Sequence, residues 1–276
     1  MPKNKQKRKT NGTMASKADK YELYLKSVQE PEHEVNFVNR VYRSAYGKPA
    51  QILREDFCGT FAVCCEWVRG KAQRRAIGVD IDPEPLAWGK RHNLPKVAES
   101  AQSRIELLED DVRSVRGPKA DIVAAQNFSF CIFKTRDELR HYFRATHANL
   151  KNEGVLITDL LGGSESIEED QEDVHKYNGF TYIWEQDRFD PITHGFKCHI
   201  HFRFKDGSEL NRAFSYEWRL WSIPEMRELM VEAGFRRTEV YWEDTDSETG
   251  EGTDVYRRRS HAESDPVWIA YIVGIK

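Results

Sequence analysis

The chain contains 276 residues, of which 39% are hydrophobic and 12% aromatic, and it carries a formal net charge of −3. This length and composition favour one domain with an insertion over two full domains. The small net charge excludes a global attraction to nucleic acid, and no apolar run approaches the roughly 18–20 residues that span a bilayer. The five cysteines are odd in number and lack a paired metal-ligand spacing, which indicates reduced thiols in a cytoplasmic protein.

The first segment, residues 1–15, is rich in lysine and arginine and has almost no bulky apolar side chains. We predict a disordered basic tail, either solvated without a function or used to bind RNA. Residues 16–276 are then expected to form a single domain. Its first part, residues 16–47, predicts two helices, the second of which begins near Pro31 and ends at Gly47.

The stretch from Gln51 to Pro85 predicts a strand, a glycine turn, a helix and a second strand that ends in an acid. Asp80 follows Gly59 by about twenty positions, which is the spacing of an adenosine-binding βαβ unit. The glycine lets the backbone approach a ligand, and Thr60 is expected to cap the helix. Asp82 precedes a proline and reads as a cap of the next helix, which leaves Asp80 to bind a ribose diol.

The turn departs from a dinucleotide-binding fingerprint, which requires three glycines. Phe57 and Phe61 stand where the other two glycines would fall, and Glu55 and Asp56 add negative charge. This charge repels a pyrophosphate and suits a ligand with a cationic centre. The alternative interpretation is an ordinary strand-to-helix turn that binds nothing.

Three further strands are predicted, over residues 105–108, 120–126 and 155–158, and each is followed by polar side chains. These include Asp111, Asn127 and Asp159. In an open α/β sheet, ligands bind outside the carboxyl ends of the strands. Together with Glu55 and Asp80, these residues therefore predict a binding site at one edge of the sheet. Thr135 and Glu138 predict a capping box for the helix between the last two strands.

After this region the pattern changes. Residues 165–173 are acidic and predict a solvated loop, and alternating aromatic residues over about 178–220 predict an antiparallel β insertion. A helix opened by Ser222 and Glu225 follows. Strands over 240–242 and 267–273, separated by a polar loop over 244–265, complete the domain.

His199 and His201 share one face of a predicted strand in the insertion. No carboxylate stands at the usual ligand spacing, so paired surface histidines are preferred to a metal site, and no metal is expected.

The segment from Leu53 to Phe61 resembles the first motif of class I S-adenosylmethionine-dependent methyltransferases, and the resemblance covers about residues 51–276. Arg54 to Thr60 is similar to a little-characterised bacterial branch of that family. The resemblance implies an α/β fold with a Rossmann-like methyltransferase sheet, mostly parallel with an antiparallel last strand, and the cofactor S-adenosyl-L-methionine. The residues that it places at the cofactor are Glu55, Asp56, Cys58, Gly59, Thr60, Asp80, Ile81, Asp111, Val112, Asn127 and Phe128.

The resemblance also implies roles. Glu55 falls at the methionine end of the cofactor, Asp80 at the ribose, and Asp111 with Val112 at the adenine. Asn127 and Asp159 are the predicted catalytic residues near the transferring methyl, Asp159 as a base or an amine anchor. The alternative for Asp159 is a cap of the helix or turn after the fifth strand.

The leading hypothesis is methyl transfer to nitrogen or oxygen of a small-molecule acceptor, because the insertion can act as a lid and the net charge is small. The first alternative is an RNA or protein methyltransferase that docks through its basic tail. The second is a non-catalytic module that binds S-adenosylmethionine. The missing glycines disfavour an NAD-dependent enzyme. No pattern in the sequence specifies an oligomeric state.

Overall fold

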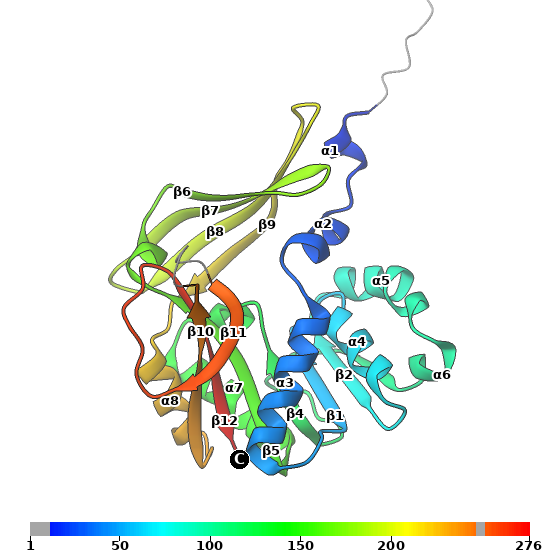
Figure 1. The fold of residues 1–276 in the computed structure, drawn as a ribbon, viewed down its shortest axis with the longest axis vertical. Coiled ribbons are helices and arrows are strands. Elements are labelled where there is room, and N and C mark those ends of the chain that lie inside the picture. Colours follow the sequence, from blue (N-terminus) through cyan, green and yellow to red (C-terminus); the bar gives the residue numbers. More distant parts are fainter. Residues whose placement is uncertain (1–11, 247–251) are drawn as a thin grey trace, which may run out of the picture.

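The computed structural model describes residues 12–246 and 252–276. Within them, the chain forms an eight-stranded sheet in the order β11-β10-β12-β5-β4-β1-β2-β3 and a separate four-stranded sheet in the order β6-β7-β8-β9 (Figure 1). The strands of the large sheet are β1 (Ile52–Asp56), β2 (Arg75–Asp80), β3 (Ile105–Glu109), β4 (Ala120–Ala125), β5 (Leu150–Gly162), β10 (Arg237–Thr245), β11 (Gly252–Arg259) and β12 (Trp268–Ile275).

The small sheet contains β6 (Gln171–Lys176), β7 (Phe180–Asp190), β8 (Gly195–Phe204) and β9 (Glu209–Arg219). The α-helices are α1 (Met14–Lys17), α2 (Lys20–Ser27), α3 (Pro31–Tyr46), α4 (Ala62–Gly70), α5 (Pro83–His92), α6 (Glu99–Gln102), α7 (Arg136–Asn149) and α8 (Ile223–Glu232). Three short 3₁₀ turns are η1 (Leu94–Lys96), η2 (Ser129–Ile132) and η3 (Ser164–Ile167).

The strands from β1 to β5 run parallel, since β1 pairs with β2 and β4, β2 with β3, and β4 with β5 in that sense. The last strand, β12, is antiparallel to both β5 and β10. The carboxyl ends of β1, β2, β4 and β5 therefore meet at one edge of the sheet, and the small sheet stands over that edge in Figure 1. The predicted α/β class, parallel sheet, antiparallel last strand and β insertion are confirmed.

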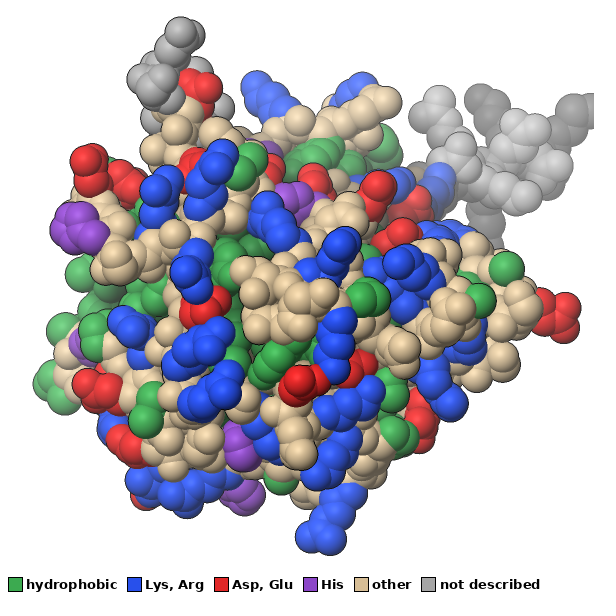
Figure 2. All heavy atoms as spheres, turned by 60° about the horizontal axis from the view of Figure 1, so that its bottom comes forward, with side chains coloured by type: hydrophobic (Ala, Val, Ile, Leu, Met, Phe, Trp, Pro, Cys, Tyr) green, Lys and Arg blue, Asp and Glu red, His purple; other side chains and the backbone are tan. Residues whose placement is uncertain are grey.

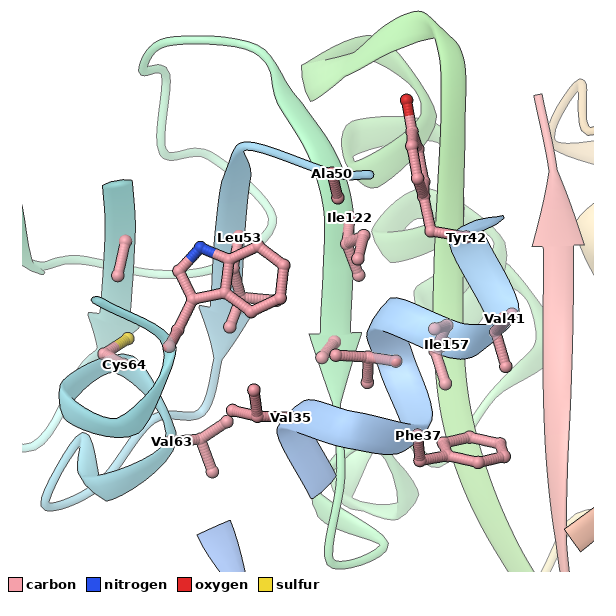
Figure 3. Close-up of a cluster of buried hydrophobic side chains, with 14 of the residues drawn as sticks. Val35, Phe37, Val41, Tyr42, Ala50, Leu53, Val63, Cys64, Ile122 and Ile157 are labelled. Atoms are coloured by element: carbon pink, nitrogen blue, oxygen red, sulfur yellow. The ribbon is translucent and has the colours of Figure 1, made fainter. Parts of the chain in front are cut away.

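Two layers of helices bury the faces of the large sheet. On one face, α3 lies over β4 and β5, and its Phe37 and Val41 belong to one buried apolar cluster with Ile122 and Ile157 (Figure 3). On the other, α7 and α8 pack through residues such as Leu139. Burying these apolar stripes is the main source of stability for such a fold. In the part of the chain described, no helix is long and apolar enough to cross a membrane.

The predicted helix signals are largely confirmed. Asp82 caps α5 by accepting a hydrogen bond from Glu84 N–H, and capping boxes open α7 and α8 as expected. Gly47 ends α3 in the left-handed region, at φ 70°. The predicted Thr60 cap is wrong, because Phe61 occupies the cap position of α4 without a side-chain cap bond.

Two strands were not predicted, and both lie at sheet edges. β6 falls in the acidic run 165–173 and beyond, and β11 falls in the polar loop 244–265. All six residues of β6 are exposed, and Tyr256 is the single buried residue of β11. An edge strand that contacts solvent on both faces needs no alternation of apolar residues, so its sequence lacks the pattern that predicts a strand.

The predicted disordered tail extends to residue 15, which is beyond the start of the first helix. Residues 1–11 lie outside the described residues, but Met14 and Ala15 belong to α1. Their backbone N–H groups donate to Asp206 and Ser208 in the turn between β8 and β9, at 2.8 and 3.0 Å. The domain therefore begins before residue 16, and its first helix is attached to the insertion.

Candidate functional site

Asp80 connects the end of β2 to the turn after β1. Its Oδ2 accepts a hydrogen bond from Gly59 N–H at 2.7 Å, and its Oδ1 accepts one from Asp82 N–H at 2.9 Å. Gly59 has a left-handed backbone, at φ 50°, which glycine adopts without strain. Burial raises the pKa of Asp80 above its ordinary value. Each carboxylate oxygen can accept more than one hydrogen bond, so Asp80 retains acceptors for the hydroxyls of a ligand.

The two phenylalanines that replace glycines keep the backbone shape that glycines would give. Phe57 and Phe61 have φ values of 58° and 47°. This conformation costs a residue with a Cβ roughly 1–2 kcal/mol, which burial of an aromatic ring can offset. Phe61 is fully buried against α5, where a Cβ added to Gly89 would lie 2.5 Å from the Phe61 ring. Its side chain therefore does not occupy the edge of the sheet.

Glu55 takes the capping role that was predicted for Thr60. Its Oε2 accepts a hydrogen bond from Cys64 N–H at 3.0 Å in the first turn of α4. Burial raises the pKa of Glu55 to about 7, and the negative charges of Asp80 and Asp56 act in the same direction. The side chains of Cys58 and Thr60 are buried beside this turn, and the Thr60 hydroxyl has no partner among the described residues.

Asp56, which was predicted to contact the cofactor, belongs to the core of the fold, where protein groups bind both of its carboxylate oxygens. Its Oδ1 forms an ion pair with Arg54 Nε at 2.6 Å, and its Oδ2 accepts a hydrogen bond from the Tyr142 hydroxyl at 2.9 Å. The Arg54 guanidinium also donates to the Val112 carbonyl at 3.2 Å. Burial raises the pKa of Asp56, whereas Arg54 and Tyr142 oppose that shift. Asp56 therefore joins β1 to α7.

Replacing Asp56 with alanine is expected to lower the free energy of unfolding by about 3–5 kcal/mol, because Arg54 would remain buried without its partner. Unfolding in guanidinium chloride measures the loss. The control is Asp173→Ala, which removes an exposed ion pair with His175 and is expected to cost at most about 1 kcal/mol. Equal losses in the two variants would contradict the structural role of Asp56.

The residues predicted to contact the adenine, Asp111 and Val112, follow β3, the outermost parallel strand of the same sheet edge. Asp111 is held by Arg113, whose guanidinium donates to both carboxylate oxygens, and this bonding lowers the pKa of Asp111. Val112 is buried. Ile81, directly after Asp80, is 70% exposed, which offers an apolar surface beside the acid. Asp111 is thus already paired with Arg113 in this structure, whereas Ile81 is open to a ligand.

Asp159 braces the turn after β4. Its two carboxylate oxygens accept hydrogen bonds from Asn127 N–H at 2.6 Å and Phe128 N–H at 2.9 Å. Both donor residues have left-handed backbones, at φ 56° and 55°. Asp159 lies within β5, which continues to Gly162, so the alternative of a cap after the fifth strand is wrong. Burial raises its pKa to about 7, while the two backbone donors oppose the shift.

Glu34 and Gln126 are buried polar residues with unpaired side-chain atoms that the sequence analysis did not single out. Glu34 lies in the first turn of α3 and is 7% exposed, and its Oε2 has no hydrogen-bond partner among the described residues. Burial raises its pKa to about 8, and the charges of Glu55 and Asp159 contribute next. Gln126, which follows β4, is also buried, and both of its amide atoms lack a partner within the described ranges. A signal for Glu34 existed, because it shares the buried stripe of α3 with Val38 and Val41.

Aromatic side chains from α2 and the insertion cover this region. The Tyr24 and Tyr216 hydroxyls share a hydrogen bond, and burial raises the pKa of Tyr24, with the charges of Glu34 and Asp159 adding to the shift. Trp218 stacks on Tyr216 at 4.7 Å and meets the edge of the Phe128 ring at 5.8 Å, between ring centroids. The insertion therefore contacts the turn that Asp159 braces.

The two histidines of β8 contact their neighbours in the small sheet. His199 is 1% exposed, so the prediction of surface histidines is wrong for this residue. Its ring nitrogens lie 2.7 Å from Ser215 Oγ and 3.2 Å from Asp187 Oδ2, and His201 Nε2 lies 2.7 Å from Glu185. Within residues 12–246 and 252–276, no group of three or more potential ligands is arranged to hold a metal ion.

A large open groove lies elsewhere, between α8, β10 and the segment after β11. Its volume is about 840 Å³, and Arg227, Arg237, Arg258 and Arg259 line it. Arg237 and Arg258 pair with Glu239, so part of this charge is neutralised. The groove contains none of the predicted site residues. Figure 2 shows lysine and arginine side chains spread among acidic ones over the end of the molecule that faces away from the small sheet.

No protein-family model and no curated protein sequence matches this chain. Solved structures do match. A S-adenosylmethionine-dependent methyltransferase from Clostridium acetobutylicum has a TM-score of 0.65 at 16% identity, over 92% of this chain and 97% of the other. CalS10, an amino pentose methyltransferase from Micromonospora echinaspora, has a TM-score of 0.63 at 19% identity, over 92% and 97%. The sugar N-methyltransferase KedS8 from a Streptoalloteichus species has a TM-score of 0.62 at 18% identity, over 100% and 98%.

These similarities extend over nearly the whole length of each chain and include the insertion. At such low identities they establish the fold, which is the Rossmann-like fold of class I methyltransferases. The fold prediction made from the segment around Gly59 is confirmed.

Proposed function

We propose that this protein transfers a methyl group from S-adenosyl-L-methionine to nitrogen or oxygen of a small-molecule acceptor. The observation that carries the proposal is the joining of Asp80 to Gly59 at the carboxyl edge of a methyltransferase-type sheet. An acid there can bind a ribose diol, and Ile81 beside it can cover an adenine ring. The glycine turn brings backbone N–H groups close to the ligand.

The charges around the turn suit this cofactor better than a dinucleotide. Glu55 and Asp80 both lie at the edge, and neither forms an ion pair with a described lysine or arginine. S-adenosylmethionine supplies an electrophilic methyl on a sulfonium and carries an ammonium group, but it has no phosphate. Glu55 is expected to attract the cationic methionine end, and Phe128 with Asn127 is expected to lie beside the reacting methyl.

The chain's own contribution to catalysis is alignment and exclusion of water. Methyl transfer is an in-line displacement, so the acceptor atom must be held opposite the leaving sulfur. Asp159 holds the turn at Asn127 and Phe128 in its left-handed shape, and Trp218 from the insertion packs on Phe128. Asp159 is thus a positioning residue for this turn in the first place.

A small acceptor is favoured because the insertion stands over the edge of the sheet (Figure 1). Similar structures include methyltransferases of an amino pentose and of a sugar nitrogen, which agrees with an acceptor of this size.

Calorimetric titration with S-adenosylmethionine and, separately, with S-adenosylhomocysteine tests the proposal. Binding of both in the micromolar range is the expected result, because the charged and apolar contacts described above act together. Failure of both ligands to bind would rule out the proposed function. Binding without turnover on any pool of small acceptors would instead favour a non-catalytic module.

One observation supports the alternative of an RNA methyltransferase, namely the arginine-lined groove at the far edge of the sheet. This alternative predicts salt-sensitive RNA binding that falls when residues 1–11 are deleted, a truncation that leaves α1 intact. Unchanged methylation of small acceptors by the truncated protein would argue against it.

A further inference from the structure

We propose that the acceptor is an amine, and that Glu34 binds its nitrogen and accepts its proton. This inference rests on the proposed function, since it assigns the acceptor subsite of the same site. The inference also goes beyond the proposed function, which allows nitrogen or oxygen, because a hydroxyl acceptor carries no positive charge for Glu34 to bind.

The first argument is the state of Glu34 itself. Its side chain is buried in the first turn of α3, yet its Oε2 lacks a hydrogen-bond partner among the described residues. A backbone hydrogen bond at Glu30 favours the charged form of the carboxyl but does not offset its burial, so a structural role does not account for this group. In Figure 1, α3 begins beside the small sheet and descends along the large sheet, which places this turn at the carboxyl edge.

The second argument is the charge around Glu34. Glu55 from β1 and Asp159 from β5 are also buried, and their charges act on Glu34 strongly enough to raise its pKa. Within the described residues, none of the three carboxylates forms an ion pair with a lysine, arginine or histidine. The cluster therefore lacks compensating positive charge. A cationic cofactor supplies part of it, and an acceptor ammonium would supply the rest.

The third argument is the aromatic wall. The hydroxyls of Tyr24 and Tyr216 share a hydrogen bond, and the charges of Glu34 and Asp159 both act on the Tyr24 hydroxyl. Phe128 and Trp218 extend the wall at the turn after β4. Faces of tyrosine, phenylalanine and tryptophan attract an organic ammonium, and a wall of this kind beside carboxylates selects a cation over a neutral alcohol.

The proposed transfer accounts for every proton and electron pair with these groups. An acceptor that binds as an ammonium transfers one proton to the Glu34 carboxylate, which leaves a neutral amine with a free electron pair. That pair forms the new nitrogen–carbon bond while the carbon–sulfur bond breaks, and the sulfur retains the bonding electrons. The product is a methylated ammonium, and the Glu34 carboxyl returns its proton to solvent. Because the pKa of Glu34 is raised to about 8, its carboxyl is mostly protonated at neutral pH without a ligand, and the carboxylate that accepts the proton forms as the pH approaches 8 or as a cationic ligand binds beside it.

The test uses the full-length protein saturated with S-adenosylhomocysteine and two probes of the same shape, benzylammonium and benzyl alcohol. The wild-type protein is expected to bind the ammonium at least about tenfold more tightly. Glu34→Gln, which keeps the shape and removes the charge, is expected to abolish that preference. The matched control is Glu32→Gln, which removes the same charge from an exposed position two residues away and is expected to keep it.

The outcomes separate the two proposals. If wild-type protein fails to bind S-adenosylhomocysteine, the proposed function itself is wrong. If the cofactor product binds but the alcohol binds as tightly as the ammonium, or neither probe binds, the amine inference is wrong. If Glu34→Gln loses affinity for S-adenosylhomocysteine itself, Glu34 belongs to the cofactor subsite and the inference is again overturned.

Discussion

Replacing Asp80 with alanine is expected to weaken the binding of S-adenosylhomocysteine by at least about a hundredfold, since each hydrogen bond to a charged group contributes roughly 1.5–3 kcal/mol. The ligand would lose two hydroxyl contacts to the carboxylate. The turn would lose the bond that Asp80 accepts from Gly59 N–H, which now holds the glycine backbone in place. Calorimetric titration of both proteins at one temperature and pH measures the ratio of their dissociation constants.

Asp82 offers a matched control, because it is an acid two positions away at the start of α5. Its side chain accepts a hydrogen bond from Glu84 N–H and is exposed. Asp82→Ala is expected to cost about 1 kcal/mol of stability through loss of the cap and to leave ligand affinity within about twofold. Asp80→Asn restores an acceptor toward Gly59 and separates the effect of charge from damage to the turn. Equal affinities of the Asp80→Ala and wild-type proteins would remove Asp80 from the site.

Replacing Glu34 with glutamine is expected to raise the free energy of unfolding at about pH 8.5 by a few kcal/mol, and to leave it nearly unchanged at about pH 4. The pKa of Glu34 is raised from 4.5 to about 8 in the folded protein. As pH rises between these values, the unfolded chain loses its proton from Glu34 while the folded chain keeps it. The folded state therefore loses stability through this interval, and the loss levels off above the folded pKa.

The groups that face Glu34 set the size of this effect. They are Glu55 on β1, Asp159 on β5, Tyr24 on α2 and Tyr271 on β12, and Glu30 precedes the same helix. None of them is a cation, so none stabilises the ionised form of Glu34. Unfolding in urea at several pH values measures the gain, with Glu32→Gln as the exposed control. A gain that does not depend on pH would show that Glu34 is not a strained carboxylate.

Together, these two expectations describe a site in which one of the groups proposed to bind a ligand lowers the stability of the protein by itself. Asp80 lies at the edge, where its carboxylate accepts hydrogen bonds from Gly59 and Asp82 N–H and retains further acceptors for a ligand, so its loss is expected to affect binding first. Glu34 is buried with its Oε2 unpaired among the described residues, so replacing it is expected to improve stability at alkaline pH. A residue that lowers the stability of the protein alone can be retained because it binds a ligand, which is the usual trade-off between stability and activity.

The arrangement around Gly59 and Asp80 was predictable because it depends on residues close together in the chain. Gly59 and Asp80 belong to one βαβ unit, and parallel pairing of β1 with β2 brings their ends together wherever the rest of the chain lies. The cap at Asp82 depends on residues within two positions of it. Periodicity and short spacings in the sequence contain this information directly.

Other parts depend on contacts between residues distant in the chain. Asp56 was predicted at the cofactor, but Tyr142 from α7 binds its carboxylate, and only the packing of α7 on the sheet reveals this. Asp159 braces the turn at Asn127, more than thirty positions earlier in the chain. The edge strands β6 and β11 have polar sequences, because exposed strands require no apolar face.

The sequence by itself therefore determined the βαβ unit of β1 and β2, the glycine turn, the acid at Asp80 and the presence of the insertion. Tertiary structure decided which acids face a ligand and which are bound by the protein itself. The physical reason is that charge and hydrogen bonding act through space. Glu34, Glu55 and Asp159 come from α3, β1 and β5, and only the folded chain buries Glu34 and brings the other two carboxylates close enough to add to the rise in its pKa.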